Sequence, residues 1–81
     1  MAATEQERSA IAQSIREARE AAGLSKIQLA EKAGLSRSGI GRIESGKRSP
    51  TGETLAALAG ALDGTFVVTA QGMTFKRGET Q

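Results

Sequence analysis

The chain has 81 residues, is 38% hydrophobic and carries a formal net charge of +2, which suits one small domain with a thin core. It contains neither cysteine nor histidine, so disulfides, thiolate or imidazole catalysis and the usual zinc sites are excluded. A core of this size hardly encloses a pocket for lysine or carboxylate chemistry. We therefore expect a protein that is not an enzyme and that needs no cofactor or metal.

No segment has the apolar length of a signal peptide or a membrane span. We expect no membrane partner and a cytoplasmic protein associated with a bacterial or phage-type nucleoid.

Positive charge is concentrated in one short segment. Between residues 36 and 48, four basic side chains stand against one acid, Glu44, an excess of three positive charges. Such a local excess is typical of a phosphate-binding surface, although a solvated helix face has the same composition. We interpret Glu44 as a structural or solubilising partner of a nearby base, not as a residue that reads DNA. The four basic residues are Arg37, Arg42, Lys47 and Arg48.

A first helix is predicted to begin near Thr4, which forms a capping-box pattern with Glu7, and to end at Gly23. Its apolar stripe consists of Ile11, Ile15, Ala18 and Ala22. Its charged residues are expected off that stripe: Arg16, Glu17, Arg19 and Glu20.

Two short helices follow with almost no connection between them. Ser25 and Gln28 form a second capping box, and Gly34 ends that helix. Ser36 caps the next one, which ends at Gly46. A short turn with glycine between two short helices predicts a helix-turn-helix. The second of these helices is weakened by small residues that would allow close approach to another surface: Ser38, Gly39 and Gly41.

Thr51 or a neighbour caps a fourth helix that stops at Asp63-Gly64. The β-branched and aromatic run 65–69 then predicts a strand, and 73–76 predicts its partner. A two-residue loop at Gln71-Gly72 would pair Val68 with Phe75. One face of this hairpin would hold Phe66, Val68, Ala70, Met73 and Phe75.

A lone hairpin is marginal in water, so it must pack on the helices or pair with a second chain. The residues expected to contribute to dimerisation are Phe66, Val67, Val68, Met73 and Phe75.

The segment from about Ile11 to Leu62 resembles the Xre family of Cro and phage-repressor DNA-binding domains. The runs 15–19, 24–36 and 43–48 carry the resemblance, together with Ile40, Pro50 and 53–55. In such domains the second helix of the motif lies in the major groove, and arginine suits the acceptors of guanine. The resemblance implies base reading by Arg37, Ser38, Gly41 and Arg42. It implies DNA-backbone contacts by Lys26, Gln28, Ser36, Ser45, Lys47 and Arg48.

The C-terminal hairpin is similar to that of HipB-like antitoxins, in which strands of two chains pair into one sheet. We therefore expect a mainly α fold: a lambda-repressor-like bundle of four to five helices with a C-terminal β-hairpin that forms a dimerisation sheet. The expected divisions are an N-terminal segment with the start of the first helix (1–10), the helix-turn-helix domain (11–63), the hairpin (64–77) and a disordered tail (78–81).

The expected function is sequence-specific binding of double-stranded DNA by a homodimeric transcriptional regulator, a repressor on a palindromic operator. Two alternatives stay open. One is an antitoxin that represses its own operon and also binds a toxin protein. The other is a protein-interaction module without DNA binding.

Overall fold

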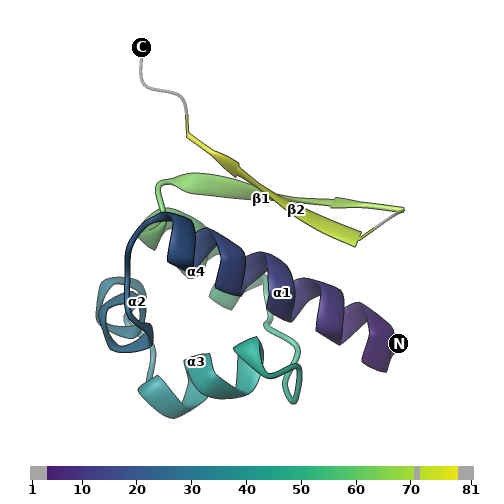
Figure 1. The fold of residues 1–81 in the computed structure, drawn as a ribbon, viewed down its shortest axis with the longest axis horizontal. Coiled ribbons are helices and arrows are strands. Elements are labelled where there is room, and N and C mark those ends of the chain that lie inside the picture. Colours follow the sequence, from purple (N-terminus) through teal and green to yellow (C-terminus); the bar gives the residue numbers. More distant parts are fainter. Residues whose placement is uncertain (1–3, 71, 79–81) are drawn as a thin grey trace.

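The computed structural model describes residues 4–70 and 72–78. Four helices are followed by a two-stranded antiparallel hairpin (Figure 1). This confirms the expected helical bundle with a C-terminal hairpin. The elements are α1 (Glu5–Ala21), α2 (Lys26–Ala33), α3 (Arg37–Glu44), α4 (Gly52–Ala61), β1 (Gly64–Thr69) and β2 (Gly72–Arg77).

Each helix begins at the side chain that the sequence predicts. In the first capping box, the Thr4 N–H donates to Glu7 Oε1 at 2.9 Å and the Glu7 N–H donates to Thr4 Oγ1 at 3.1 Å. The bond from the Thr4 backbone, helped by the Thr4 hydroxyl, lowers the pKa of Glu7. The stabilisation that the Glu7 carboxylate adds to this cap is therefore fully present above the ordinary glutamate pKa and is lost as pH falls through the lowered one. The other N-caps are Ser25, Ser36 and Thr51.

The core draws one fully buried side chain from each helix, and Met73 of β2 completes it at 8% exposure. The four helices thus converge on a single cluster, as one small domain requires. The four side chains are Ile15, Leu29, Ile40 and Leu58, each 0% exposed.

The buried face of α1 differs from the predicted stripe at its C-terminal end. Ala22 is exposed because α1 ends at Ala21 and Ala22 is only its C-cap. Arg19, which the stripe predicts in solvent, is buried instead. The physical reason lies in α3, where a buried carboxylate satisfies the guanidinium.

Arg19 and Glu44 form a bidentate ion pair in the interior. Nε of Arg19 lies 2.8 Å from Oε2 of Glu44, and Nη2 lies 3.1 Å from Oε1. The third nitrogen, Nη1, donates to the Leu24 carbonyl oxygen at 2.8 Å. The side chains are only 11% and 2% exposed. The pair therefore joins α1, the turn before α2 and the C-terminal end of α3, and it confirms Glu44 as a structural partner of a base.

The hydrogen bond with Glu44 raises the pKa of Arg19 above its ordinary value. The stability that Arg19 gains from this bond is present at every pH below the ordinary pKa of arginine and is lost only above it. Arg19 is therefore charged throughout the neutral range.

The hairpin register differs from the predicted one by two residues. Phe66 pairs with Phe75 and Val68 pairs with Met73, whereas the predicted pairing joined Val68 to Phe75. The predicted loop included Gly72, which instead lies in β2; Gln71 lies outside the described residues. The observed register places two aromatic rings opposite each other, with centroids 5.0 Å apart, a contact that the predicted register forfeits. Because side chains alternate along a strand, a shift of two residues in the pairing leaves the same side chains on each face of the hairpin.

The hairpin packs on the helices of its own chain, β2 against α1 and β1 against α4 (Figure 1). Phe66 and Phe75 contact the core around Met73, whereas Val68 is 75% exposed.

Hydrogen bonds also hold the hairpin in place. The Ser14 hydroxyl donates to the Met73 carbonyl, and the Gly78 N–H donates to Asp63 O at 2.6 Å. The rest of the predicted tail, 79–81, lies outside the described residues.

Within residues 4–70 and 72–78, none of the helices is long and apolar enough to cross a membrane. The same part of the chain contains no cluster of His, Cys, Asp or Glu suited to a metal ion.

The ion pair generates a stability prediction. Glu44→Ala leaves the Arg19 guanidinium buried without its carboxylate, and we expect a loss of about 3–5 kcal/mol in the free energy of unfolding. Glu20→Ala is the matched control, because its carboxylate lies 3.9 Å from Arg19 but is 62% exposed, and it should cost less than about 1 kcal/mol.

Urea unfolding followed by circular dichroism measures both variants, since the chain has no tryptophan or tyrosine. The double variant Arg19→Met/Glu44→Leu should be more stable than Glu44→Ala, because no buried charge remains unpaired. Equal losses from Glu44→Ala and Glu20→Ala would contradict this account.

Candidate nucleic-acid interface

Helix α3 lies on the side of α1 that faces away from the hairpin (Figure 1). Ile40 and Ile43 turn inward and are 0% and 3% exposed. Glu44 is equally buried, so the single acid of the basic segment is withdrawn from the surface. The outer face of the helix therefore carries positive charge alone. Of the predicted base-reading residues, Gly41 is half-buried and the others are exposed: Arg37, Ser38 and Arg42.

The two glycines of α3 have different roles in the fold. A Cβ at Gly39 would lie 2.9 Å from the Ser36 hydroxyl, which caps the helix by accepting the Gly39 N–H at 3.0 Å. Gly39 therefore has a structural explanation. A Cβ at Gly41 would meet nothing within 4 Å, and the local backbone is ordinary helix. Nothing within the described part of the chain requires glycine at position 41.

The N-terminal end of α3 carries a small hydroxyl cluster. Ser36 Oγ and Ser38 Oγ lie 3.5 Å apart, and both residues are exposed. Ser36 uses its oxygen as the helix cap, so its hydroxyl hydrogen is the group left for a ligand.

The loop after α3 is fixed to that helix by its backbone. Gly46 has a left-handed φ of +80°, and the N–H groups of Lys47 and Arg48 both donate to the Arg42 carbonyl, at 3.0 and 3.2 Å. The side chains of Lys47 and Arg48 are exposed. Ser45 is exposed at the start of the same loop, and its hydroxyl donates to the same Arg42 carbonyl at 3.0 Å.

The N-terminal end of α2 supplies the remaining predicted backbone contacts. Lys26 and Gln28 are both exposed. The carboxamide oxygen of Gln28 accepts the Ser25 N–H at 2.8 Å, which leaves the carboxamide NH₂ group for an acceptor such as a phosphate. Between them, Ile27 is 47% exposed. Helix α2 packs directly against α3, so the structure brings both groups of predicted contacts into one part of the molecule.

Two arginines of α1 also belong to this part of the molecule, and sequence reasoning gave them no role. Arg16 Nη1 donates to the Glu44 carbonyl at 3.2 Å, and Arg8 Nε donates to the Gly46 carbonyl at 3.2 Å. Their partners are 28 and 38 residues away in the chain. The sequence offers a signal for Arg8 alone. It lies about three helical turns from Arg19, so both arginines share one face of α1.

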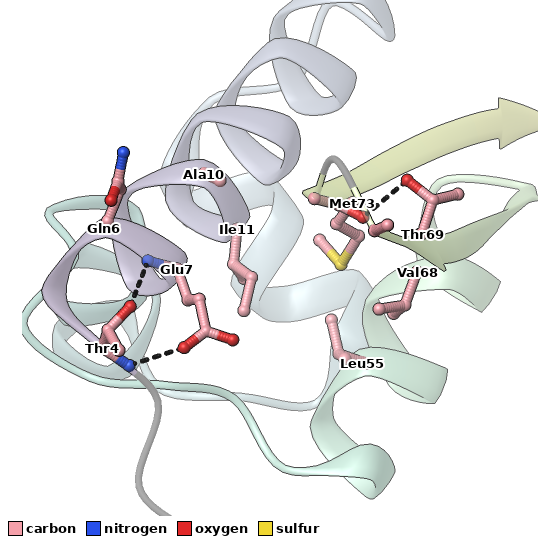
Figure 2. A pocket seen from close by; sticks show the side chains of 11 residues that line it. Thr4, Gln6, Glu7, Ala10, Ile11, Leu55, Val68, Thr69 and Met73 are labelled. Carbon is pink, nitrogen blue, oxygen red and sulfur yellow. Dashed lines mark hydrogen bonds between the residues drawn. The ribbon is translucent and has the colours of Figure 1, made fainter.

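A groove lies elsewhere, between the N-terminal half of α1, α4 and the end of the hairpin. Its volume is about 380 Å³. Figure 2 shows the apolar side chains that face it, with Val68 opposite Ile11 and Leu55. Of the predicted dimerisation residues, Val68 and Met73 line the groove, Val67 lies on the opposite face of the hairpin, and Phe66 and Phe75 pack on the core.

Comparison with known proteins agrees with this geometry. The family model HTH_3, helix-turn-helix, matches residues 15–68. The crystal structure of the restriction-modification controller protein C.AhdI from Aeromonas hydrophila is similar, with 40% identity and a TM-score of 0.70 over 72% of this chain and 88% of that one. Among curated proteins, no sequence matches the chain.

An HTH_3 family transcriptional regulator from Vibrio cholerae is 36% identical, with a TM-score of 0.69 over 72% of this chain and 33% of that one. The controller protein C.Esp1396I, solved as a tetramer in complex with its natural 35 base-pair operator, is 28% identical, with a TM-score of 0.66 over 69% of this chain and 74% of that one.

The matched segment contains all of α2, α3 and α4, with the basic outer surface of α3 at its centre. The chain belongs to the HTH_3 helix-turn-helix family of DNA-binding transcriptional regulators.

Proposed function

We propose that this protein binds double-stranded DNA in a sequence-specific manner, with α3 in the major groove, and represses transcription from a palindromic operator. The observation that carries the proposal is the outer face of α3, where Arg37 and Arg42 are exposed while Glu44 is buried and neutralised by Arg19. A helix with an acid on that face would repel phosphates. In this helix the acid is turned inward.

The proposed base-reading residues are the three exposed residues of α3 and the half-buried Gly41. An arginine donates to both N7 and O6 of guanine, which makes Arg37 and Arg42 the main determinants of sequence. Ser38 offers a hydroxyl donor and acceptor, and Gly41 allows the helix to approach the bases.

The proposed backbone contacts surround α3 at both ends. Lys47 and Arg48 come from the loop after the helix, and their fixed backbone positions favour contact with one strand. Lys26 and the Gln28 amide come from α2, where the free N–H groups of a helix start also attract phosphate. The two serines at the ends of α3 complete the set, Ser36 and Ser45.

We further propose that residues 11–63 form the DNA-binding unit and that the hairpin, 64–77, joins two copies. Val68 is 75% exposed at the edge of a groove whose apolar lining includes Ile11, Leu55 and Met73 (Figure 2). Because Val68 and the groove lie on the same surface, they suit a twofold interface in which Val68 of each copy enters the groove of the other. Such a dimer would present two α3 helices about 34 Å apart, one helical turn of DNA.

The assembly described for C.Esp1396I, a tetramer on its operator, supports an oligomeric regulator. Similarity to controller proteins and to a transcriptional regulator favours this function over an antitoxin with a toxin partner and over an interaction module without DNA binding.

Selection of duplexes from a random DNA pool tests the sequence-specific function. We expect an enriched inverted repeat, and Arg37→Ala or Arg42→Ala should each weaken binding to it by about 1–3 kcal/mol, roughly 5- to 150-fold. Lys47→Ala should weaken binding to all duplexes about equally. Lys76→Ala is the charge-matched control, because Lys76 lies on the hairpin, and it should bind as the parent does. Failure to enrich any sequence would refute the proposal.

Gly41→Ala separates folding from DNA binding. The new methyl group meets nothing in the described chain, so alanine should raise the free energy of unfolding by about 1 kcal/mol through helix propensity. The same methyl group would obstruct the approach of α3 to the bases and lower affinity for the selected duplex. A variant that is more stable and binds DNA as tightly as the parent would show that position 41 does not face DNA.

The dimer surface is tested by Val68→Lys, which places a charge in the proposed apolar contact. Sedimentation equilibrium should show a dimer for the parent and a monomer for the variant, with the fold unchanged because Val68 is exposed. Thr74→Lys is the control, since Thr74 is exposed on the opposite face of the hairpin, and it should remain dimeric. A parent that sediments as a monomer at every concentration would rule out this interface.

A further inference from the structure

Helix α1 extends two arginines, one from each half, to the C-terminal end of α3 and the turn after it, and the function proposed above uses neither. Arg16 donates to the carbonyl of Glu44, the last residue of α3, and Arg8 donates to the carbonyl of Gly46, two residues later. Both guanidinium groups thus lie at the base of the loop that carries Lys47 and Arg48.

The C-terminal end of a helix carries a partial negative charge, close to half an elementary charge, on its unpaired carbonyl groups. In α3 this end adjoins the loop proposed to contact phosphates, so it would oppose binding there. The Arg16 guanidinium bonds the carbonyl of the last α3 residue and so offsets this negative charge, and the Arg8 guanidinium bonds the Gly46 carbonyl in the turn just beyond. Both arginines therefore adjoin the loop that carries the exposed side chains of Lys47 and Arg48.

The two arginines differ from Arg19, which serves the core. Arg19 is buried and bound to a carboxylate, whereas Arg16 is exposed and Arg8 is half-buried. Among the described residues Arg16 takes part in no ion pair, and its bond to the Glu44 carbonyl uses one of the five N–H donors of a guanidinium. Its charge is therefore available to an anion.

We propose that Arg16 and Arg8 bind DNA phosphates and so extend the DNA interface from α3 and its loop onto α1. This inference rests on the proposed DNA binding. The carbonyl bonds hold each planar guanidinium in place before DNA arrives, which reduces the entropy lost when it meets a phosphate.

The test is the salt dependence of binding to a random-sequence duplex, measured for the parent, Arg16→Gln and Arg8→Gln. Removal of one arginine–phosphate pair should reduce the slope of log affinity against log salt by about 0.9. Between 50 and 200 mM salt, the advantage of the parent over each variant should accordingly shrink about three- to fourfold. The weakening should be the same for random and selected duplexes, because phosphates carry no sequence information.

Two further variants separate charge from structure. Arg77→Gln is the matched control: Arg77 also donates to a helix-end carbonyl, that of Ala21 at 3.4 Å, but it lies on the hairpin, so the slope should stay that of the parent. Arg16→Lys keeps the positive charge but lacks the planar guanidinium, and it should retain most of the dependence of log affinity on log salt.

Arginine variants that bind more weakly but keep the slope of the parent would show that Arg16 and Arg8 only position the loop, which overturns the inference and leaves the proposed function intact. A parent that binds no duplex would overturn both.

Discussion

The buried ion pair between Arg19 and Glu44 is the constraint on which the rest of this structure depends. Helix α3 has eight residues, two of them glycine, and such a segment is not stable as an isolated helix. It persists because Ile40 and Ile43 pack inward and because Glu44 is bound to α1 through two hydrogen bonds. Arg19 also holds the Leu24 carbonyl, so one side chain sets the position of α3 relative to both α1 and the start of α2. A weak helix is thereby given a defined orientation.

The same ion pair determines the charge of the surface. By drawing Glu44 into the interior it removes the single acid from a basic segment, and the outer face of α3 then presents Arg37 and Arg42 without a competing carboxylate. Helix α1 thus acts on α3 in two ways: Arg19 holds the helix from within, and Arg16 bonds the carbonyl of its last residue from outside and offsets the negative end of its dipole. Arg8 bonds the Gly46 carbonyl in the turn just beyond the helix. The hairpin covers the other side of α1 and completes the core through Met73, so α1 separates the hairpin from the proposed DNA-binding surface.

Contacts between residues close in the chain could be predicted from the sequence, whereas contacts between residues far apart in the chain could not. Capping boxes join residues three positions apart, so the starts of α1 and α2 can be predicted from the sequence, and helical periodicity identified the inward Ile15 and Ala18. Periodicity alone placed Arg19 in solvent, because the carboxylate that permits its burial is 25 residues away. The carbonyl partners of Arg16 and Arg8 are equally remote. The hairpin register was wrong because a shift of two residues preserves both faces; the ring contact between Phe66 and Phe75 distinguishes the two registers.

The central claim is that α3, held by the ion pair, lies in the major groove. Methylation interference with dimethyl sulfate on a selected duplex tests it directly, because this reagent methylates guanine N7 in the major groove and adenine N3 in the minor groove. We expect guanine methylation to block binding at positions in two half-sites about one helical turn apart, and adenine methylation to have little effect. Interference confined to adenine N3, or absent from both grooves, would contradict the account.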